Sequence, residues 1–459
     1  LKLKLNDSKA TRWGALVIVA FTMMAAYYVN DVVAPLKTML ETDLAWSSTD
    51  FGFFTGGYSF LNVFFLMLIW GGLILDRFGI RFTGKLATIL MVGGTALEYY
   101  AMTGLAGADA TLFGINEIFG YKTGVFVAFA GYSIFGVGAE VAGITVSKII
   151  AKWFKGKELA TAMGVQVALA RIGSQAGYAV AIPLARAFGI STPVLLGLVL
   201  LLGGMIAFFI FAVMDKKLDK QMEAAAIAAG TEDEEEKFSF KDVKNILVNP
   251  GFWLIALLCV LFYSCVFPFQ KFASELMIIK YGINENVAGT FAGLPALGAL
   301  ILTPVFGGFI DKRGKSASIM LLGSAMLICV HFIHAIPDIN YWLVAIVLMI
   351  ILGIAFSLVP SAMWPAVAKI FPVSQLGTAY ALIFFIQNIG LWGIPTLIGW
   401  VLDAYCISGK KPDGTNMYDY TVPMCIFTSI ACLSLIVALL LKKADKKYGY
   451  KLEEPNIQK

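Results

Sequence analysis

The chain has 459 residues, of which 59% are hydrophobic and only 14% are charged. Its mean hydropathy is +0.80, whereas soluble domains carry about 25% charged residues. This composition indicates a polytopic membrane protein and leaves no room for a soluble catalytic domain. The net charge of +5 does not indicate nucleic-acid binding, because the basic residues gather on alternate loops.

Long apolar runs recur along the whole chain, and a bilayer core of about 30 Å needs about 20 apolar residues per helix. The runs predict twelve transmembrane helices, at residues 13–36, 48–75, 84–106, 123–151, 159–188, 192–214, 250–279, 286–310, 316–336, 341–369, 376–404 and 421–442. The first run is too long for a signal peptide and is expected to be a retained span. Most Lys and Arg residues fall in the two tails and in alternate loops, which predicts that both termini are cytoplasmic.

These spans divide into two halves of six helices. The expected units are a cytoplasmic N-tail (1–12), an N-terminal bundle (13–214), a cytoplasmic linker (215–249), a C-terminal bundle (250–442) and a cytoplasmic C-tail (443–459). The linker is rich in Lys at its ends and includes an acidic run at 232–236, which predicts a solvated segment.

A similar loop follows the second and the eighth predicted spans, which indicates a duplicated half. The shared pattern consists of Gly72, Asp76, Arg77, Gly79 and Arg81 in the first copy, and of Gly307, Asp311, Lys312 and Gly314 in the second. The first glycine allows close helix approach, the aspartate can accept hydrogen bonds from a helix N-terminus, and the basic residues can pair with lipid or a helix end. We expect a gating latch on the cytoplasmic side, and the simpler alternative is a turn that obeys the positive-inside rule.

Two opposite charges, Glu140 and Arg171, lie inside apolar spans on either side of a basic turn. Glu140 lies about 18 Å along its helix from Lys152, and Arg171 about 20 Å from Glu158, so both reach a similar depth. A charge at a helix centre costs about 2.5 to 3.5 kcal/mol on insertion scales, so both side chains are expected to face a polar interior. They form either a substrate site or a structural ion pair without a ligand.

Other polar residues in the spans are further candidates. Asp31 lies in the outer half of the first span and could bind a substrate ammonium, carry a proton or cap an outer gate. Tyr28 beside it offers a hydrogen bond, although aromatic residues near an interface are often plain anchors.

In the second half, Tyr263, Gln387 and Asn388 fall near mid-depth, where amides rarely face lipid. Asn388 could bind a peptide or bond across helices. Trp364 precedes Pro365, which is expected to kink the helix, and its indole could form an inner gate or serve in packing.

The duplicated loop resembles the signature of the major facilitator superfamily, and the resemblance covers all twelve spans. It implies an all-α fold of two pseudo-symmetric six-helix bundles that rock around a central site, lined by the first, fourth, seventh and tenth helices. A narrower resemblance, to the animal lysosomal dipeptide transporters, rests on residues 153–159, 170–174, 266–269, 364–368, 375–380 and 386–391. In that family a glutamate in the fourth helix and an arginine in the fifth hold the two ends of a dipeptide, and the matching positions here are Glu140 and Arg171.

The sequence departs from the animal proteins after Asp31, where Val32 and Val33 stand in place of Asn-Pro. Its one glycosylation sequon begins at Asn6 in the cytoplasmic tail, and no long N-terminal extension carries a sorting signal. We therefore expect a prokaryotic relative in the bacterial inner (plasma) membrane, as a monomer without the accessory glycoprotein of the animal transporter.

The predicted function is a secondary transporter that moves dipeptides by alternating access, as a uniporter. One alternative is a proton-coupled carrier of organic anions or amino acids, and another is a non-transporting receptor or scaffold. No catalytic set, phosphate loop or metal spacing is visible, so we expect neither an enzyme nor a cofactor. Glu140 and Arg171 both belong to the first half, so a group of the second half is expected to contact the same ligand. The candidates are Asn388, Tyr263 and Trp364.

Overall fold

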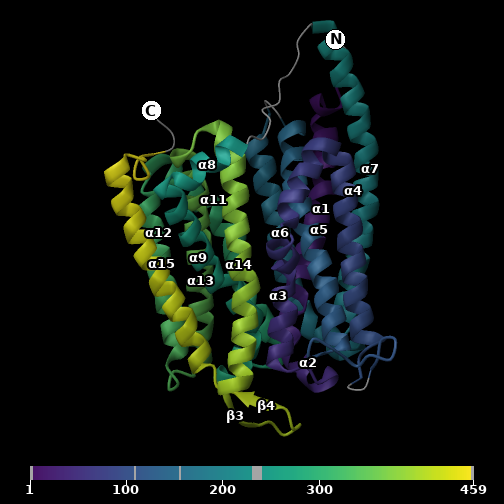
Figure 1. Ribbon diagram of the computed structural model, residues 1–459, viewed down its shortest axis with the longest axis vertical. Helices are drawn as coiled ribbons and strands as arrows, with labels where there is room; N and C mark the ends of the chain where they lie inside the picture. The colour runs from purple at the N-terminus through teal and green to yellow at the C-terminus, as the bar shows by residue number, and fades with distance from the viewer. Residues whose placement is uncertain (1–3, 108–109, 155–156, 230–239, 456–459) are drawn as a thin grey trace.

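The structure is a computed structural model, and it describes residues 4–107, 110–154, 157–229 and 240–455. The chain is almost entirely helical (Figure 1). The first half contains α1 (Lys9–Val32), α2 (Lys37–Leu44), α3 (Ser48–Phe64), α4 (Met67–Thr103), α5 (Thr123–Trp153), α6 (Leu159–Phe188) and α7 (Thr192–Ala229). The second half contains α8 (Phe240–Val248), α9 (Pro250–Tyr281), α10 (Glu285–Ala292), α11 (Leu294–Arg313), α12 (Ser316–Ala335), α13 (Trp342–Ile370), α14 (Val373–Tyr405) and α15 (Thr421–Tyr448).

Two short antiparallel hairpins and two 3-10 turns complete the fold. Strand β1 (Glu117–Ile118) pairs with β2 (Tyr121–Lys122), and β3 (Ile407–Lys410) pairs with β4 (Asn416–Tyr418). The turns lie at Leu5–Asp7 and Ala34–Leu36.

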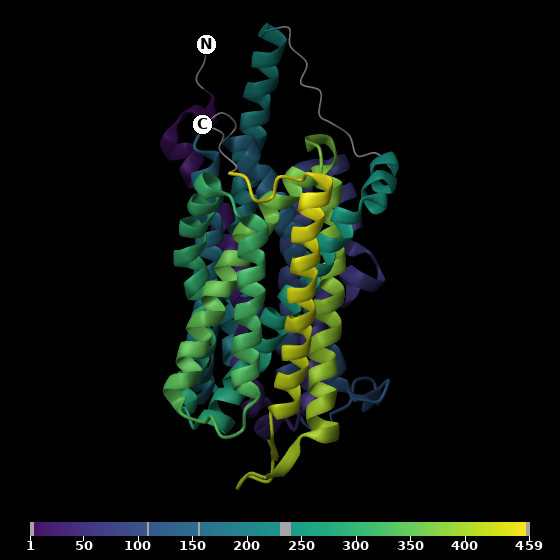
Figure 2. The ribbon, with the colours of Figure 1, turned by 90° about the vertical axis from the view of Figure 1, so that its left-hand side faces the viewer.

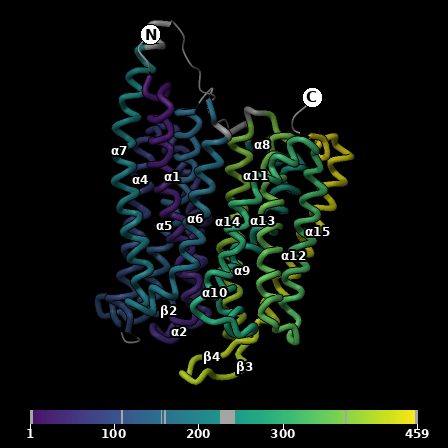
Figure 3. Tube along the Cα trace, turned by 180° about the vertical axis from the view of Figure 1, so that it is seen from behind, coloured from purple at the N-terminus to yellow at the C-terminus, as the bar shows by residue number. Residues whose placement is uncertain are grey.

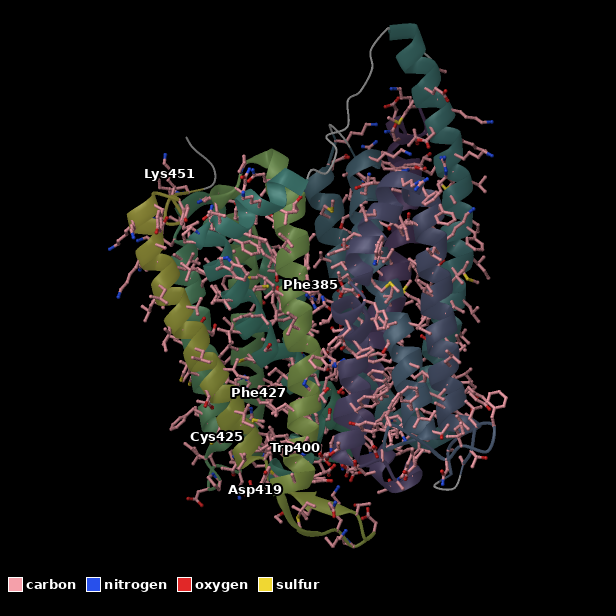
Figure 4. All side chains as sticks on the ribbon, viewed as in Figure 1. Phe385, Trp400, Asp419, Cys425, Phe427 and Lys451 are labelled. Atoms are coloured by element: carbon pink, nitrogen blue, oxygen red, sulfur yellow. The ribbon has the colours of Figure 1, made fainter. Side chains whose placement is uncertain are left out.

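The helices stand in two bundles side by side, α1 to α7 in one and α8 to α15 in the other (Figures 1 and 3). Both termini lie at one end of the molecule and the β3–β4 hairpin lies at the other (Figure 2). We call these the inner end and the outer end. Figure 4 places Lys451 at the inner end and Asp419 at the outer end.

The order of the predicted spans is confirmed. Nine helical segments in the described part of the chain are long and apolar enough to cross a membrane, and the pair α3 and α4, bent by 58°, is a tenth candidate. Helix α4 contains two helices that meet at Gly79, where φ is 75° and ψ is 174°. Its 37 residues would extend about 55 Å if straight, which exceeds the bilayer core, so the second span ends and the third begins at this kink. The predicted fifth span coincides with α6.

Local capping explains where several helices begin. Ser47 Oγ accepts a hydrogen bond from the backbone of Asp50 (3.1 Å), and the Asp50 carboxylate accepts one from the backbone of Ser47 (2.9 Å), which forms a capping box at the start of α3. Pro250 opens α9, and the Asn249 side chain accepts a hydrogen bond from the next backbone amide.

Glycine lets the two bundles touch through backbone at the outer end. A Cβ on Gly52 of α3 would lie 2.4 Å from Pro395 O and 2.9 Å from Gly399 Cα of α14. A Cβ on Gly399 would lie 2.3 Å from Ser48 O. A larger side chain at either position therefore requires the bundles to separate here.

The first copy of the duplicated loop contacts its own bundle. The Lys148 ammonium lies 3.2 Å from the Asp76 carboxylate, and the Arg77 guanidinium lies over the neighbouring Phe78 ring. Arg81 pairs with Asp215 and Asp219 of α7. Asp76 therefore binds a lysine side chain of α5 and not the helix N-terminus that was predicted.

The second copy packs against the C-terminal segment. Lys315 and Ser316 donate backbone hydrogen bonds to Glu453 O (3.1 Å) and Leu452 O (3.0 Å). A Cβ on Gly314, whose φ is 70°, would lie 2.4 Å from the Glu453 carbonyl. Among the described residues, no atom lies within 4 Å of a Cβ added at Gly72 or Gly307. The two copies share a sequence pattern but contact different parts of the chain.

The expected linker begins as a continuation of α7 and ends with α8. Its acidic run at 232–236 lies outside the described residues, as do Lys155 and Gly156 of the basic turn. All six cysteines are described and free, so Cys406 and Cys425 are not bridged.

Asp215 is expected to be the main stabilising acid at the inner end. It is fully buried and accepts hydrogen bonds from Lys152 Nζ (2.8 Å), Trp153 Nε1 (2.9 Å) and Arg81 Nη1 (3.3 Å). Asp215→Ala leaves these donors without their buried acceptor and is expected to cost about 1 to 3 kcal/mol of stability. The thermal unfolding of the purified protein measures this loss.

Asp219→Ala is the matched control, because Asp219 pairs with the same two cations but its side chain is 41% exposed. The control is expected to cost less than about 1 kcal/mol. Equal losses for the two variants would contradict the assigned role of Asp215.

Candidate functional site

A cavity of about 620 Å³ lies between the two bundles. The predicted lining helices α1, α5, α9 and α13 all contribute to it, and α3, α4, α6 and α14 contribute as well. Six of the predicted substrate-binding residues face this cavity: Glu140, Arg171, Tyr263, Trp364, Gln387 and Asn388. Predicted residues from both halves of the sequence therefore lie around one cavity.

Glu140 projects from α5 into the cavity and accepts a hydrogen bond from the Tyr58 hydroxyl of α3 at 2.9 Å. Among the described residues, the Tyr58 hydroxyl is the one hydrogen-bond donor to this carboxylate, and it contacts Oε1. Tyr58 thus orients Glu140, and sequence reasoning did not single out this tyrosine, because nothing in the sequence links it to a residue 82 positions away.

Arg171 projects from α6 into the same cavity, with its guanidinium carbon over two aromatic rings. The ring centroids lie 5.5 Å away for Tyr27 and 4.8 Å away for Phe356. Within the described chain, no carboxylate lies within 4.0 Å of this guanidinium. Glu140 and Arg171 therefore do not form the structural ion pair that was one of the two predictions for them.

The second bundle supplies an aromatic wall to the cavity. The Trp364 indole donates a hydrogen bond to the Tyr263 hydroxyl (3.3 Å) and stacks on Phe384 at 4.8 Å. Tyr380 donates to the Trp364 carbonyl at 2.9 Å. Trp364 is thus a packed element of the cavity wall, and its ring is held by Tyr263 and Phe384.

Two buried amides lie beside this wall on α14. Gln387 Oε1 accepts a weak hydrogen bond from Cys259 Sγ at 3.6 Å. Asn388 donates to Phe384 O at 2.9 Å, and its Oδ1 has no partner within the described chain. Asn388 therefore presents an unused acceptor in a residue that lines the cavity.

Lys271 lines the cavity and pairs with Asp31 across the bundle interface. Lys271 of α9 donates to Asn30 O (2.5 Å), Asp31 Oδ1 (3.1 Å) and Tyr132 Oη (3.4 Å), so one lysine of the second bundle joins three groups of the first. Asp31 itself does not line the cavity. Of the three predicted roles, this placement favours the cap of an outer gate.

Tyr28 lies outside the cavity. It is 3% exposed, and its hydroxyl donates to Pro193 O of α7 at 3.2 Å. The helical turn directs it into the first bundle, whereas its neighbour Tyr27 faces the cavity. The prediction of Tyr28 as a substrate-binding residue is therefore not retained.

A second set of charges joins the bundles at the outer end, and the sequence analysis missed it. Lys37 Nζ lies 2.5 Å from Glu41 and 2.6 Å from Glu275 of α9. Lys411, at the turn after β3, lies 3.6 Å from Glu41 and 3.8 Å from Glu275. Tyr420 donates a hydrogen bond to Glu275. An acid inside the predicted span at 250–279 was the available signal for Glu275.

The same signal applied to Glu98 on α4, an acid inside the predicted span at 84–106 that the sequence analysis also missed. Glu98 is fully buried, and neither of its carboxylate oxygens has a hydrogen-bond partner within the described chain. It does not line the cavity.

The positions of the ion pairs define the conformation. Among the described residues, the pairs that cross between bundles all lie in the outer half, namely Lys37–Glu275, Lys411–Glu41, Lys271–Asp31 and Arg186–Glu285. The pairs at the inner end stay within one bundle, as for Arg12–Glu158 and Lys152–Asp215. The lining residue Val167 is 43% exposed, whereas Lys271 is 9% exposed. The cavity is therefore closed at the outer end and open toward the inner end.

Two bundles around a central cavity that opens toward one end of the molecule define a membrane transporter. A model of the family described as Major Facilitator Superfamily matches residues 16–395. The chain belongs to this superfamily, and it is a transporter rather than an enzyme.

The resemblance to the animal dipeptide transporters is also confirmed. The chain is 28% identical over 450 residues to the lysosomal dipeptide transporter MFSD1 of Homo sapiens. The aligned region covers 95% of this chain and 87% of that protein. Among solved structures, a D-xylose-proton symporter aligns with a TM-score of 0.67 at 15% identity, over 94% of this chain and 97% of that one. A peptide transporter of the POT type aligns with a TM-score of 0.66 at 14% identity, over 95% and 94%. These structures establish the fold.

Gly399→Val is expected to open the outer end. The added Cβ would meet Ser48 O and the Gly52 backbone, and neither can yield like a flexible side chain. The opening is detected with a single cysteine at position 272 (Phe272→Cys) in a background without native cysteines. This position is inaccessible while the outer end is closed, because the buried Phe272 ring packs on Phe51 across the interface at 5.4 Å. Its labelling by a membrane-impermeant maleimide is expected to rise.

Gly393→Val on the same helix is the control, because no atom lies within 4 Å of the Cβ position there. This variant is expected to label as slowly as the parent. Unchanged labelling in Gly399→Val would show that backbone contact does not hold the outer end closed.

Proposed function

We propose that the protein carries dipeptides as zwitterions, with Glu140 binding the ammonium group and Arg171 binding the carboxylate. One observation supports this most directly: two opposite charges face one cavity without pairing with each other. A dipeptide has a nearly fixed distance between its charged ends while its side chains vary. Arginine suits a carboxylate because its planar fork makes two parallel hydrogen bonds.

Groups of the second bundle complete the proposed site. Asn388 Oδ1 is an unused acceptor and would bind a peptide N–H or the ammonium group. Tyr263, Trp364 and Gln387 would line the space for the side chains of the substrate. Asp31 is assigned to the outer gate, because Lys271 already neutralises it.

We propose a uniport mechanism with alternating access. The inward-open state is held by the cross-bundle charges at the outer end. Their separation, with closure of the signature loops at the inner end, would produce the outward-open state. The inner end is assigned to the cytoplasm from the distribution of Lys and Arg.

Removing one end of the ligand or its partner in the protein tests the site. Charged hydrogen bonds contribute about 1.5 to 3 kcal/mol, so Arg171→Ala and Glu140→Gln are each expected to lower dipeptide uptake into proteoliposomes by about 10- to 100-fold. C-terminal amidation of the dipeptide is expected to impair uptake by the parent protein and to have little further effect in Arg171→Ala.

N-terminal acetylation provides the reciprocal test. It is expected to lower uptake little further in Glu140→Gln, where the partner of the ammonium group is already gone. In Arg171→Ala it is expected to lower uptake as much as in the parent, because the contact to the ammonium group is intact there. Additive losses in every combination would contradict this assignment of the two ends.

A pH gradient tests the uniport mechanism. In counterflow with a labelled dipeptide, the rate is expected to be the same with and without a pH gradient. Uphill accumulation driven by the gradient would support the proton-coupled alternative, and the unpartnered acid Glu98 would then be the first residue to replace.

We also propose that the protein acts as a monomer in a bacterial plasma membrane. The support is the position of the sequon at Asn6 in the N-tail, which the distribution of Lys and Arg assigns to the cytoplasm, where this sequon would not be glycosylated. The human relative named above is described as a lysosomal transporter, so the proposed membrane differs from that of the relative, while the proposed roles of Glu140 and Arg171 are the same.

A further inference from the structure

The guanidinium of Arg171 is bounded by one aromatic ring from each bundle. Tyr27 belongs to α1 of the first bundle and Phe356 to α13 of the second. Both rings present a face to the cation. No described carboxylate lies within ion-pair distance, so these two faces and the cavity are the environment of the charge.

Phe356 is held rigidly by other rings of its own bundle. It is 2% exposed, and it packs edge-on against Phe267 at 5.3 Å and Tyr263 at 6.3 Å. Tyr263 in turn stacks on Phe267 at 5.4 Å and accepts the hydrogen bond of Trp364. Phe356 is thus the end of an aromatic wall whose other members line the cavity, although Phe356 itself does not.

A planar cation that contacts ring faces can keep its N–H edge free. Cation–π contact and hydrogen bonding use different parts of the guanidinium, so the rings can fix its plane while its fork binds a carboxylate. The contact to Phe356 depends on the relative position of the two bundles, whereas the contact to Tyr27 is made within one bundle.

We propose that Phe356 is a positioning residue that orients Arg171 for the substrate carboxylate. Because Phe356 belongs to the second bundle, this orientation depends on the relative position of the two bundles. This inference deepens the proposed function and rests on it, because it assumes that Arg171 binds the carboxylate. It supplies the second-bundle contact that a clamp built from α5 and α6 alone lacks. By linkage, a substrate that binds better when the ring is in place also favours the arrangement that puts it there.

The test compares Phe356→Leu, which keeps an apolar side chain but removes the ring face, with Phe356→Tyr, which keeps the face. Cation–π contacts predict that Phe356→Leu raises KM for dipeptide uptake by about 2- to 30-fold, with a smaller change in kcat. Phe356→Tyr is expected to restore KM toward the parent value. Uptake of a C-amidated dipeptide, which has no carboxylate, is expected to be equally slow in the parent and in both variants.

A packing control is Phe371→Leu, at the end of α13, where a buried ring contacts Phe252 and not Arg171. It removes a similar ring from the same bundle and is expected to leave KM unchanged. The thermal unfolding of all three variants is measured alongside, so that a loss of folded protein is separated from a change in KM.

Three results would overturn the inference: an unchanged KM in Phe356→Leu, an equal rise in KM for the free and the amidated dipeptide, or no recovery in a folded Phe356→Tyr. Arg171→Ala separates this failure from failure of the proposed function. If Arg171→Ala transports dipeptides normally, the proposed site is wrong. If Arg171→Ala is impaired while Phe356→Leu is normal, only the role of Phe356 is wrong.

Discussion

The cost of placing a charge in hydrocarbon is the constraint on which this structure depends. Each charge near the bundle interface has to find a counter-charge, an aromatic face or a water-accessible cavity. At the outer end, Lys37 and Lys271 find carboxylates across the interface and thereby join the two bundles. At the centre, Glu140 and Arg171 face the cavity instead. Because buried charges need partners, the cross-bundle ion pairs join the outer end of the carrier, and the unpaired charges at the centre face a polar cavity.

The outer closure combines charge with close backbone contact. Gly52 and Gly399 allow α3 and α14 to touch, and the buried ions beside them lose much of their stabilisation once the helices separate. The inner-end ion pairs do not cross the interface in the described chain, so they do not oppose separation there. The cross-bundle ion pairs therefore lie at the closed end of the cavity, and the signature loops lie at the other end.

Much of the fold followed from local properties of the sequence. Apolar runs located the helices, and α6 and α9 begin at the predicted residues. Depth along a helix is also local, which is why Glu140 and Arg171 could be placed at one level before any contact was known. The direction of a side chain around its helix was harder to predict: adjacent Tyr27 and Tyr28 face the cavity and the bundle interior respectively. One residue of rotation, about 100°, decides between them.

By itself, the sequence determined the membrane spans, their duplicated order and the presence of two opposite charges at mid-depth, because hydrophobicity and helical rise act over neighbouring residues. Only the tertiary structure decided which charges pair. Lys37, Glu275 and Lys411 lie on separate segments of the chain, and Phe356 reaches Arg171 from the opposite bundle. These contacts depend on the rigid placement of one bundle against the other, which no local pattern encodes, because ion pairs and cation–π contacts act only over a few ångströms.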